Sequence, residues 1–170
     1  MLCRSFIAVA ALATLTACEN GAMPGGNGSA PASALAAQCL ADPAQSQDME
    51  NALNAARQVE GKTILRNHAN LSAIAQNHAC DMARMGQGTV AGSDGSNIVE
   101  RARAVSYPTC GVVQLVTVGG TPTQVVNRWL ASKPHREQVL GQLSTDIGAG
   151  VTIGPDGRQW WSVVMGHDCR

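Results

Sequence analysis

A repeating pattern in the last quarter of the sequence constrains the fold most, because it predicts a β-hairpin. From residue 147 to 153, apolar residues alternate with smaller ones, which is the period of two expected of a strand. A Gly-Pro-Asp-Gly turn follows, and residues 158 to 165 return as an apolar second strand. Gly148 and Gly150 leave one face of the first strand without side chains, which invites close packing by a helix.

Two further features concern strands. Trp160 and Trp161 are adjacent on the second strand and must point to opposite faces, so we expect at most one of them to belong to the core. Residues 112 to 118 are rich in β-branched side chains and end at two glycines, which predicts a third strand that Gln114 interrupts.

Helices are expected before and between these strands. Asp42-Pro43-Ala44-Gln45 and Thr121-Pro122-Thr123-Gln124 each combine an N-cap, a proline at the first helical position and an answering glutamine. Apolar spacing predicts helices that end near Gly61 and Gly86, and a short one over residues 98 to 105. The apolar stripe of the first helix should consist of Met49, Leu53, Ala56 and Val59. The fold class is therefore α+β, with a three-stranded, mainly antiparallel sheet flanked by helices.

Two histidines lie at positions that bear on function. His78 is on the apolar face of the second helix, where we expect a hydrogen-bonded core residue. Pro134 prevents the helix that starts at Thr121 from running on, so a second short helix should begin near His135. At that position His135 either lines a ligand pocket or serves as a capping and packing residue.

The first 37 residues predict export and anchoring. Residues 1 to 17 have the charged and apolar regions of a secretory leader, with an apolar run too short to span a bilayer. Leu15-Thr16-Ala17-Cys18 resembles a bacterial lipobox, in which Cys18 would carry lipid; a plain cleaved signal is the alternative. Residues 18 to 37 form a Gly-, Ala-, Pro- and Ser-rich tether. We expect a lipid-anchored protein of the cell envelope, in the outer membrane or periplasm.

Four cysteines remain for the folded part of the chain, which suits two disulfides in an exported domain. Four cysteines allow three connectivities, of which we favour Cys39 with Cys169 and Cys80 with Cys110. A zinc site is the competing use of these residues, but no pair has the short spacing that zinc sites show.

The charge pattern argues against nucleic acid as a partner. The formal net charge is zero, and no acidic or basic block occurs along the chain. Aromatic residues make up only 3% of the sequence, so stacking platforms for bases are not expected.

Five short motifs are spread over residues 49 to 166. They are Asn54-x-x-Arg57, Ala75-Gln76-x-His78-Ala79-x-x-Met82, Gly92-Ser93-Asp94-Gly95-Ser96, Trp129-x-x-Ser132-x-x-His135-Arg136 and Ile147-Gly148-x-Gly150-Val151. In this order and spacing they make the chain resemble the CAP superfamily of cysteine-rich secretory, antigen 5 and plant pathogenesis-related proteins, and most of all its short bacterial form. The resemblance implies that residues 38 to 170 fold as an α-β-α sandwich with a cavity over the sheet.

In many members of that family, two histidines and one or two glutamates of the cavity bind a divalent metal. By the resemblance, His135 stands at the second histidine and Val90 at the first, while Gln114 replaces the strand glutamate and Ser132 stands near the other glutamate. Zinc needs about three ligands drawn from His, Cys, Asp and Glu, even in catalytic sites. Gln114 cannot exchange a proton near neutral pH. We therefore expect no metal, cofactor or catalytic residue, and assign these four positions to ligand binding.

Three functions remain open. The first is a monomeric, non-enzymatic envelope protein that binds a lipid, a small molecule or another protein. The second is a metal-dependent hydrolase or metal carrier with a rearranged site, and the third is a structural or adhesive surface module. A hydrolytic pair of Ser132 and His135 would lack a visible orienting acid and a nucleophile elbow.

Overall fold

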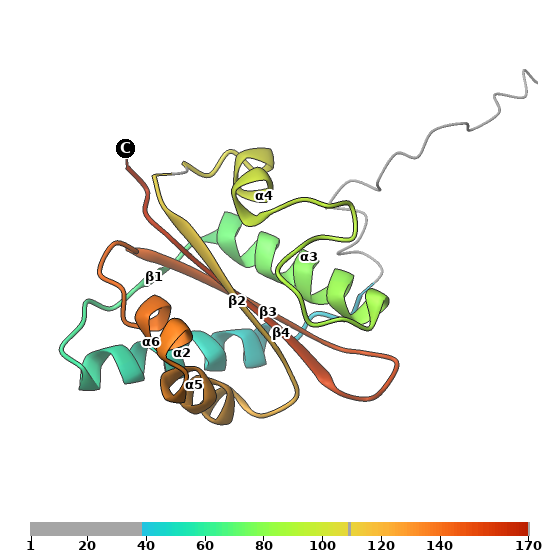
Figure 1. The fold of residues 1–170 in the computed structure, drawn as a ribbon, viewed down its shortest axis with the longest axis horizontal. Helices are drawn as coiled ribbons and strands as arrows, with labels where there is room; N and C mark the ends of the chain where they lie inside the picture. The colour runs from blue at the N-terminus through green and yellow to red at the C-terminus, as the bar shows by residue number, and fades with distance from the viewer. Residues whose placement is uncertain (1–38, 109, 170) are drawn as a thin grey trace, which may run out of the picture.

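Helices cover both faces of a β-sheet in the computed structural model, which describes residues 39–108 and 110–169 (Figure 1). The elements are α2 (Pro43–Val59), β1 (Arg66–Asn67), α3 (Ala69–Met85), α4 (Ile98–Ala104), β2 (Val112–Val118), α5 (Pro122–Ala131), α6 (Lys133–Val139), β3 (Asp146–Ile153) and β4 (Gln159–Gly166). The expected α-β-α sandwich is confirmed. The expected leader, Cys18 and the tether lie outside the described residues.

The sheet has four strands in the order β1-β3-β4-β2. β3 and β4 form the expected hairpin, and β2 pairs antiparallel with β4 so that Val112 lies opposite Gly166. β1 is a fourth strand that the sequence analysis missed, and it pairs parallel with β3 through Arg66 and Asn67. These two residues are polar and exposed, so they carry no periodic signal.

α3 packs directly on the glycines of β3. A side-chain carbon added at Gly148 would stand 2.0 Å from the backbone nitrogen of Ser72, and one added at Gly150 would stand 2.3 Å from that of Gln76. Such an approach is open only to glycine, so the expected close packing by a helix is confirmed. α3 and α4 cover this face of the sheet, while α2, α5 and α6 cover the other (Figure 1).

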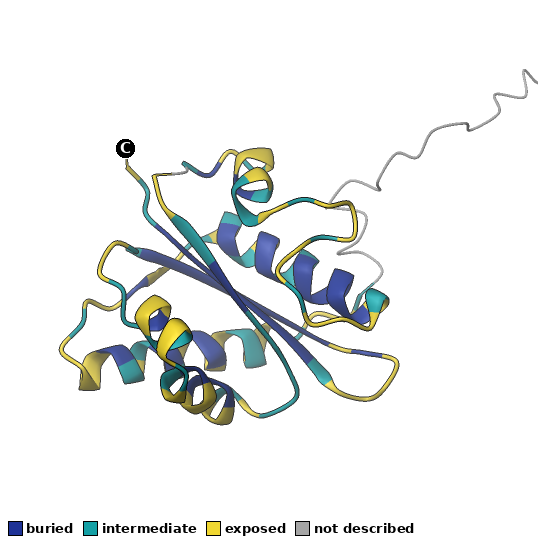
Figure 2. Ribbon diagram, in the orientation of Figure 1, coloured by how far each residue is buried: buried dark blue, intermediate teal, exposed yellow. Residues whose placement is uncertain are grey.

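Both tryptophans of β4 are buried, with exposed fractions of 1% for Trp160 and 0% for Trp161. They point to opposite faces as predicted: Trp160 packs with Met82 of α3, and Trp161 packs in the cluster that includes Val125 of α5. The expectation that at most one would be core was wrong, because helices cover the sheet on both sides. Figure 2 shows β3 and β4 buried along nearly their whole length.

The end of α2 differs from the expected apolar stripe. Val59 is 87% exposed, whereas Arg57 is fully buried. Arg57 donates from Nε to the carbonyl of Thr63 at 2.8 Å, and from Nη1 to those of Val139 at 2.6 Å and Gly141 at 2.8 Å. These three carbonyls allow the buried guanidinium to join α2 to the end of α6.

Local signals fixed the other helix boundaries as predicted. Asp42 caps α2 by accepting from the backbone of Gln45, and Thr121 with Gln124 forms a capping box at the start of α5. Gly86 ends α3 in the left-handed conformation with φ of 68°. Within the described part of the chain, no helix has the length and apolar character needed to cross a membrane.

The two disulfides are confirmed in number, but the favoured pairing of Cys39 with Cys169 and Cys80 with Cys110 was wrong. The structure joins Cys39 to Cys80 and Cys110 to Cys169, with Cα–Cα distances of 5.8 and 5.9 Å. Antiparallel pairing of β2 with β4 brings the start of one strand beside the end of the other, and this places Cys110 next to Cys169. Cys39 lies ahead of α2 and is left to meet Cys80 of α3.

Candidate functional site

Arg101 of α4 binds two of the four expected site positions. Its Nη2 donates to Gln114 Oε1 at 2.5 Å and to the carbonyl of Val90 at 2.8 Å, and its Nη1 donates to the carbonyl of Ser96 at 2.6 Å. Gln114 is buried on β2, and its Nε2 donates to Ser162 Oγ at 2.9 Å. One guanidinium thus draws Val90 and Gln114 together.

A well-capped short helix positions Arg101. Asn97 and Glu100 form a capping box at the start of α4, so the helix begins at a fixed residue. Burial lowers the pKa of Arg101, while the charges of Asp94 and Asp81 oppose that shift. A guanidinium stays protonated in proteins, so a cation stands permanently beside Gln114.

Ser132 and His135, the other two expected positions, form a pair at the junction of α5 and α6. Ser132 Oγ lies 2.8 Å from His135 Nδ1. Pro134 lies in the first turn of α6, and His135 follows it in that turn, as the sequence predicted. In the described part of the chain, no carboxylate is hydrogen-bonded to His135, so an orienting acid is absent from the pair.

His78 is the hydrogen-bonded core residue that the sequence predicted. It is 2% exposed, and its Nε2 lies 2.7 Å from the carbonyl of Thr89. A carbonyl only accepts, so Nε2 carries the proton. Burial and the charge of Arg101 lower the pKa of His78, which favours the neutral imidazole.

The residues at the four positions do not fit the metal that the fold family implies. Val90 offers only its carbonyl, which Arg101 already occupies, and the same guanidinium would repel a divalent cation from Gln114. Gln114 points toward α3 and α4, as Val116 on the same face of β2 does, whereas Ser132 and His135 belong to the α5–α6 layer. No hydrogen bond among residues 39–108 and 110–169 joins the two pairs, and no three His, Cys, Asp or Glu side chains there could hold a metal ion.

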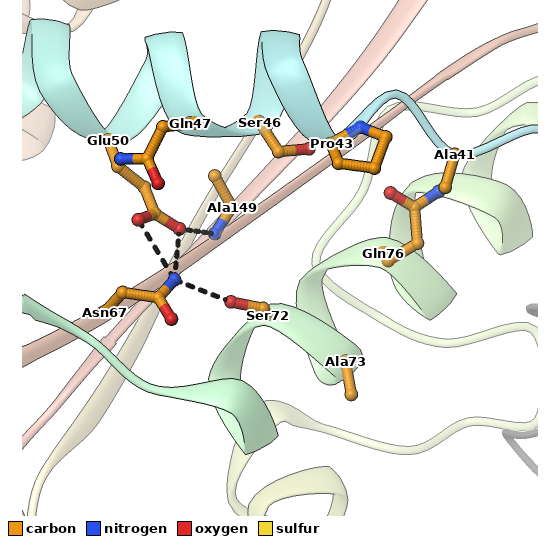
Figure 3. Close-up of a pocket in the computed structure, with 10 residues that line it drawn as sticks. All are labelled: Ala41, Pro43, Ser46, Gln47, Glu50, Asn67, Ser72, Ala73, Gln76 and Ala149. Atoms are coloured by element: carbon orange, nitrogen blue, oxygen red, sulfur yellow. Dashed lines mark hydrogen bonds between the residues drawn. The ribbon is translucent and has the colours of Figure 1, made fainter.

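A separate pocket lies between α2 and α3 at the β1 end of the sheet, and the sequence analysis missed it. This Glu50 pocket has a volume of about 410 Å³. It is lined by Ala41, Pro43, Ser46, Gln47, Glu50, Asn67, Ser72, Ala73, Gln76 and Ala149. Figure 3 shows the Glu50 carboxylate directed at Asn67, with Ser72 beyond it, and Ala41, Pro43, Ala73 and Gln76 toward the other end.

Glu50 is 4% exposed and is held from two sides (Figure 3). Asn67 Nδ2 donates to both carboxylate oxygens, at 2.9 and 3.0 Å, and the backbone N–H of Ala149 donates to Oε1 at 3.0 Å. Burial raises the pKa of Glu50, while the hydrogen bonds from Asn67 and Ala149 act in the opposite direction. The carboxylate is therefore fixed in place and incompletely solvated.

A helical signal for Glu50 was present in the sequence. Glu50 precedes Leu53 by three residues and Arg57 by seven, which places all three on one face of α2. The predicted buried stripe of that helix included only apolar residues. An acidic residue on the buried face was the signal that could have found the pocket.

Comparisons with known proteins identify the fold. The model of the family described as "CAP: Cysteine-rich secretory protein family" matches residues 50–165. A comparison with curated protein sequences found no match. An outer surface protein from Borrelia burgdorferi has a similar structure, with a TM-score of 0.68 at 18% identity over 76% of this chain and 98% of that one.

Two longer bacterial proteins are also similar in structure. An extracellular protein containing an SCP domain from Bacillus anthracis gives a TM-score of 0.62 at 14% identity, over 72% of this chain and 40% of that one. A cysteine-rich secretory protein from Staphylococcus aureus gives 0.56 at 20% identity, over 73% and 38%. This chain spans less than half of either protein, and at these identities the likeness concerns the fold alone.

The family model covers more than half of the chain, and its match runs from within α2 into β4, so that it includes part or all of every strand of the sheet. The chain belongs to the cysteine-rich secretory protein (CAP) family.

Proposed function

We propose that the protein is a non-catalytic binding module of the bacterial cell envelope. The observation that carries this proposal is the hydrogen bonding of Arg101 to Gln114 and to the carbonyl of Val90. These are two positions at which the family resemblance expects metal ligands. A fixed internal cation takes the acceptors that a metal would need, so the scaffold remains while the metal chemistry is lost.

Hydrolysis without a metal has little support in the same residues. Gln114 stands where a carboxylate would serve as acid or base, and an amide does not exchange protons near neutral pH. Ser132 and His135 are within hydrogen-bond distance, but His135 has no carboxylate partner in the described part of the chain. A binding role needs neither group to react.

A zinc titration followed by native mass spectrometry tests the proposal. We expect the mature wild-type chain to take up no stoichiometric zinc at low micromolar metal. A one-to-one zinc adduct that disappears in His135→Ala but persists in His167→Ala would contradict the proposal. The function would then be that of a metal-dependent hydrolase or metal carrier.

Location at the envelope has three supports. The first 18 residues resemble a secretory leader that ends in a lipobox, and two disulfides suit an oxidising compartment. The Borrelia burgdorferi neighbour is named an outer surface protein. Acyl chains on Cys18 would anchor the protein stably, at about 0.8 kcal/mol for each buried methylene.

Substitution of the lipobox cysteine tests the anchor. Cys18→Ser should move the protein from the membrane fraction to the soluble fraction, because no acyl chain could then be attached. Recovery of the variant in membranes at the wild-type level would refute lipid anchoring at this residue.

A further inference from the structure

The Glu50 pocket exists because β1 stops early. β1 pairs with β3 only through Arg66 and Asn67, which lie opposite Asp146 and Ile147. Beyond that point no strand of the described residues neighbours the edge of β3, which faces the space between α2 and α3. Backbone groups on an open strand edge need other partners.

Side chains from α2 and α3 form hydrogen bonds with most of the backbone groups on this open edge of β3. Glu50 of α2 accepts from the N–H of Ala149 at 3.0 Å. Gln76 of α3 accepts from the N–H of Val151 at 3.2 Å and donates to its carbonyl at 3.1 Å. The carbonyl of Ala149 points to the same side as its N–H, and within the described residues no donor binds it. Along this edge, the Ala149 carbonyl and the charged Glu50 carboxylate, which already accepts from Asn67 and Ala149, therefore face the pocket as acceptors.

The charge of Glu50 is not balanced inside the pocket. Glu50 is the one ionisable residue among the ten that line it, and it has no ion pair with any described residue. A carboxylate that is 4% exposed and lacks a cation is costly, so a cationic ligand would gain from pairing with it. Asn67 and Ala149 already hold the carboxylate in one orientation, which reduces the cost of ordering it on binding.

Three small apolar residues offer contact for a short hydrocarbon chain in the part of the pocket away from Glu50. Ala41, Pro43 and Ala73 lie toward the end away from the Glu50 carboxylate (Figure 3). These small apolar side chains offer contact to methylene groups and no hydrogen bond. A volume of about 410 Å³ lies within the range of small-molecule sites.

We propose that the Glu50 pocket binds a small ligand through a primary ammonium group, which pairs with the Glu50 carboxylate and donates to the Ala149 carbonyl while its aliphatic part contacts Pro43 and Ala73. The proposal rests on the binding role proposed above, and it places the ligand away from Gln114 and His135. Because Glu50 also holds β1 and β3 to α2, its structural role must be separated from ligand binding by experiment.

Nuclear magnetic resonance of the mature chain carrying Cys18→Ser provides the test, with butylammonium as the probe. The Ala149 amide and the Asn67 side-chain amide should shift saturably, with a Kd on the order of 1 mM for a ligand of five heavy atoms. Butanol has the same shape without charge and should shift them far less. Butyltrimethylammonium keeps the charge without N–H donors and should bind several-fold more weakly.

Three variants separate recognition from folding. Glu50→Gln should weaken butylammonium binding at least tenfold, whereas Asp48→Asn removes an exposed carboxylate of the same helix and should leave binding unchanged. Ala73→Leu fills the pocket from the exposed side of α3 and should abolish binding with a preserved spectrum, which keeps the test valid if Glu50→Gln unfolds.

Equal shifts with butanol, or wild-type affinity in Glu50→Gln or Ala73→Leu, would overturn the inference. Equal affinity for butyltrimethylammonium would refute the hydrogen bond to Ala149. If butylammonium fails to bind and the wild type also takes up no zinc, the inference falls while the proposed function stands. Stoichiometric zinc uptake with butylammonium binding intact would remove the proposed function instead.

Discussion

Gly150→Ala tests the close packing of α3 on β3. The added carbon would stand 2.3 Å from the backbone nitrogen of Gln76 and 2.5 Å from the carbonyl carbon of Ala75. Ordinary contact between such atoms is about 3.5 Å, so α3 would have to withdraw by about 1.2 Å. Because the obstacle is helix backbone, we expect the free energy of unfolding to fall by about 3 kcal/mol, which is the upper end of the usual cost of overpacking. Weakening the hydrogen bonds of Gln76 to Val151 should add about 1 kcal/mol.

Urea denaturation followed by circular dichroism measures this cost, with disulfides intact in every sample. A loss of about 4 kcal/mol corresponds to a fall in Tm of about 15 °C for a domain of this size. Gly111→Ala is the matched control, because an added carbon there meets nothing within 4 Å and should change stability by less than about 0.5 kcal/mol. A loss below about 1 kcal/mol in Gly150→Ala would show that α3 does not lie so close to β3.

Three further predictions concern Glu50, a helix cap and a disulfide. Burial raises the pKa of the Glu50 carboxyl above its ordinary value of 4.5, so the folded state favours the protonated form. The free energy of unfolding of the wild type, relative to Glu50→Gln, should therefore be greatest below pH 4.5 and should fall as the pH rises through the folded-state pKa of Glu50. A constant difference in this free energy from about pH 4 to 7 would contradict the prediction. Thr121→Ala removes the cap of α5 and should cost about 1 kcal/mol in urea denaturation, and an unchanged midpoint would argue against the capping box. Replacing Cys39 and Cys80 together by serine should cost about 4 kcal/mol in the chain-entropy account of a 41-residue loop, and peptide mapping of the wild type should recover the Cys39–Cys80 link.

Local signals predicted most of the fold. The caps at Asp42 and Thr121, the stop at Gly86 and the glycine pattern of β3 each act within a few residues, so a single sequence reveals them. Disulfide pairing depends on which strands become neighbours. The residue pattern predicted β2 and β4 but not their register, and the pairing of Cys110 with Cys169 follows from that register.

The candidate site also combines features that the local sequence predicts with features that depend on how distant elements pack. The break at Pro134 could be read from a single residue, the place of Gln114 came only from the family resemblance, and Ser132 does meet His135. Arg101 could not be placed, because its role depends on how α4 packs beside β2. Glu50 was missed because only apolar residues of its helix were followed, and the strand edge that it binds could not be foreseen, since β1 is too short to give a pattern.

The Cys39–Cys80 disulfide also determines how mechanical force would enter the domain. A pull on the chain ahead of Cys39 passes through the sulfur atoms into α3 before it can reach α2, which begins only at Pro43. α3 is seated on the glycines of β3, so the load would fall on the centre of the sandwich. A tether on the amino-terminal side would therefore hold the domain by α3, which packs directly on the central sheet, and tension would not peel α2 away.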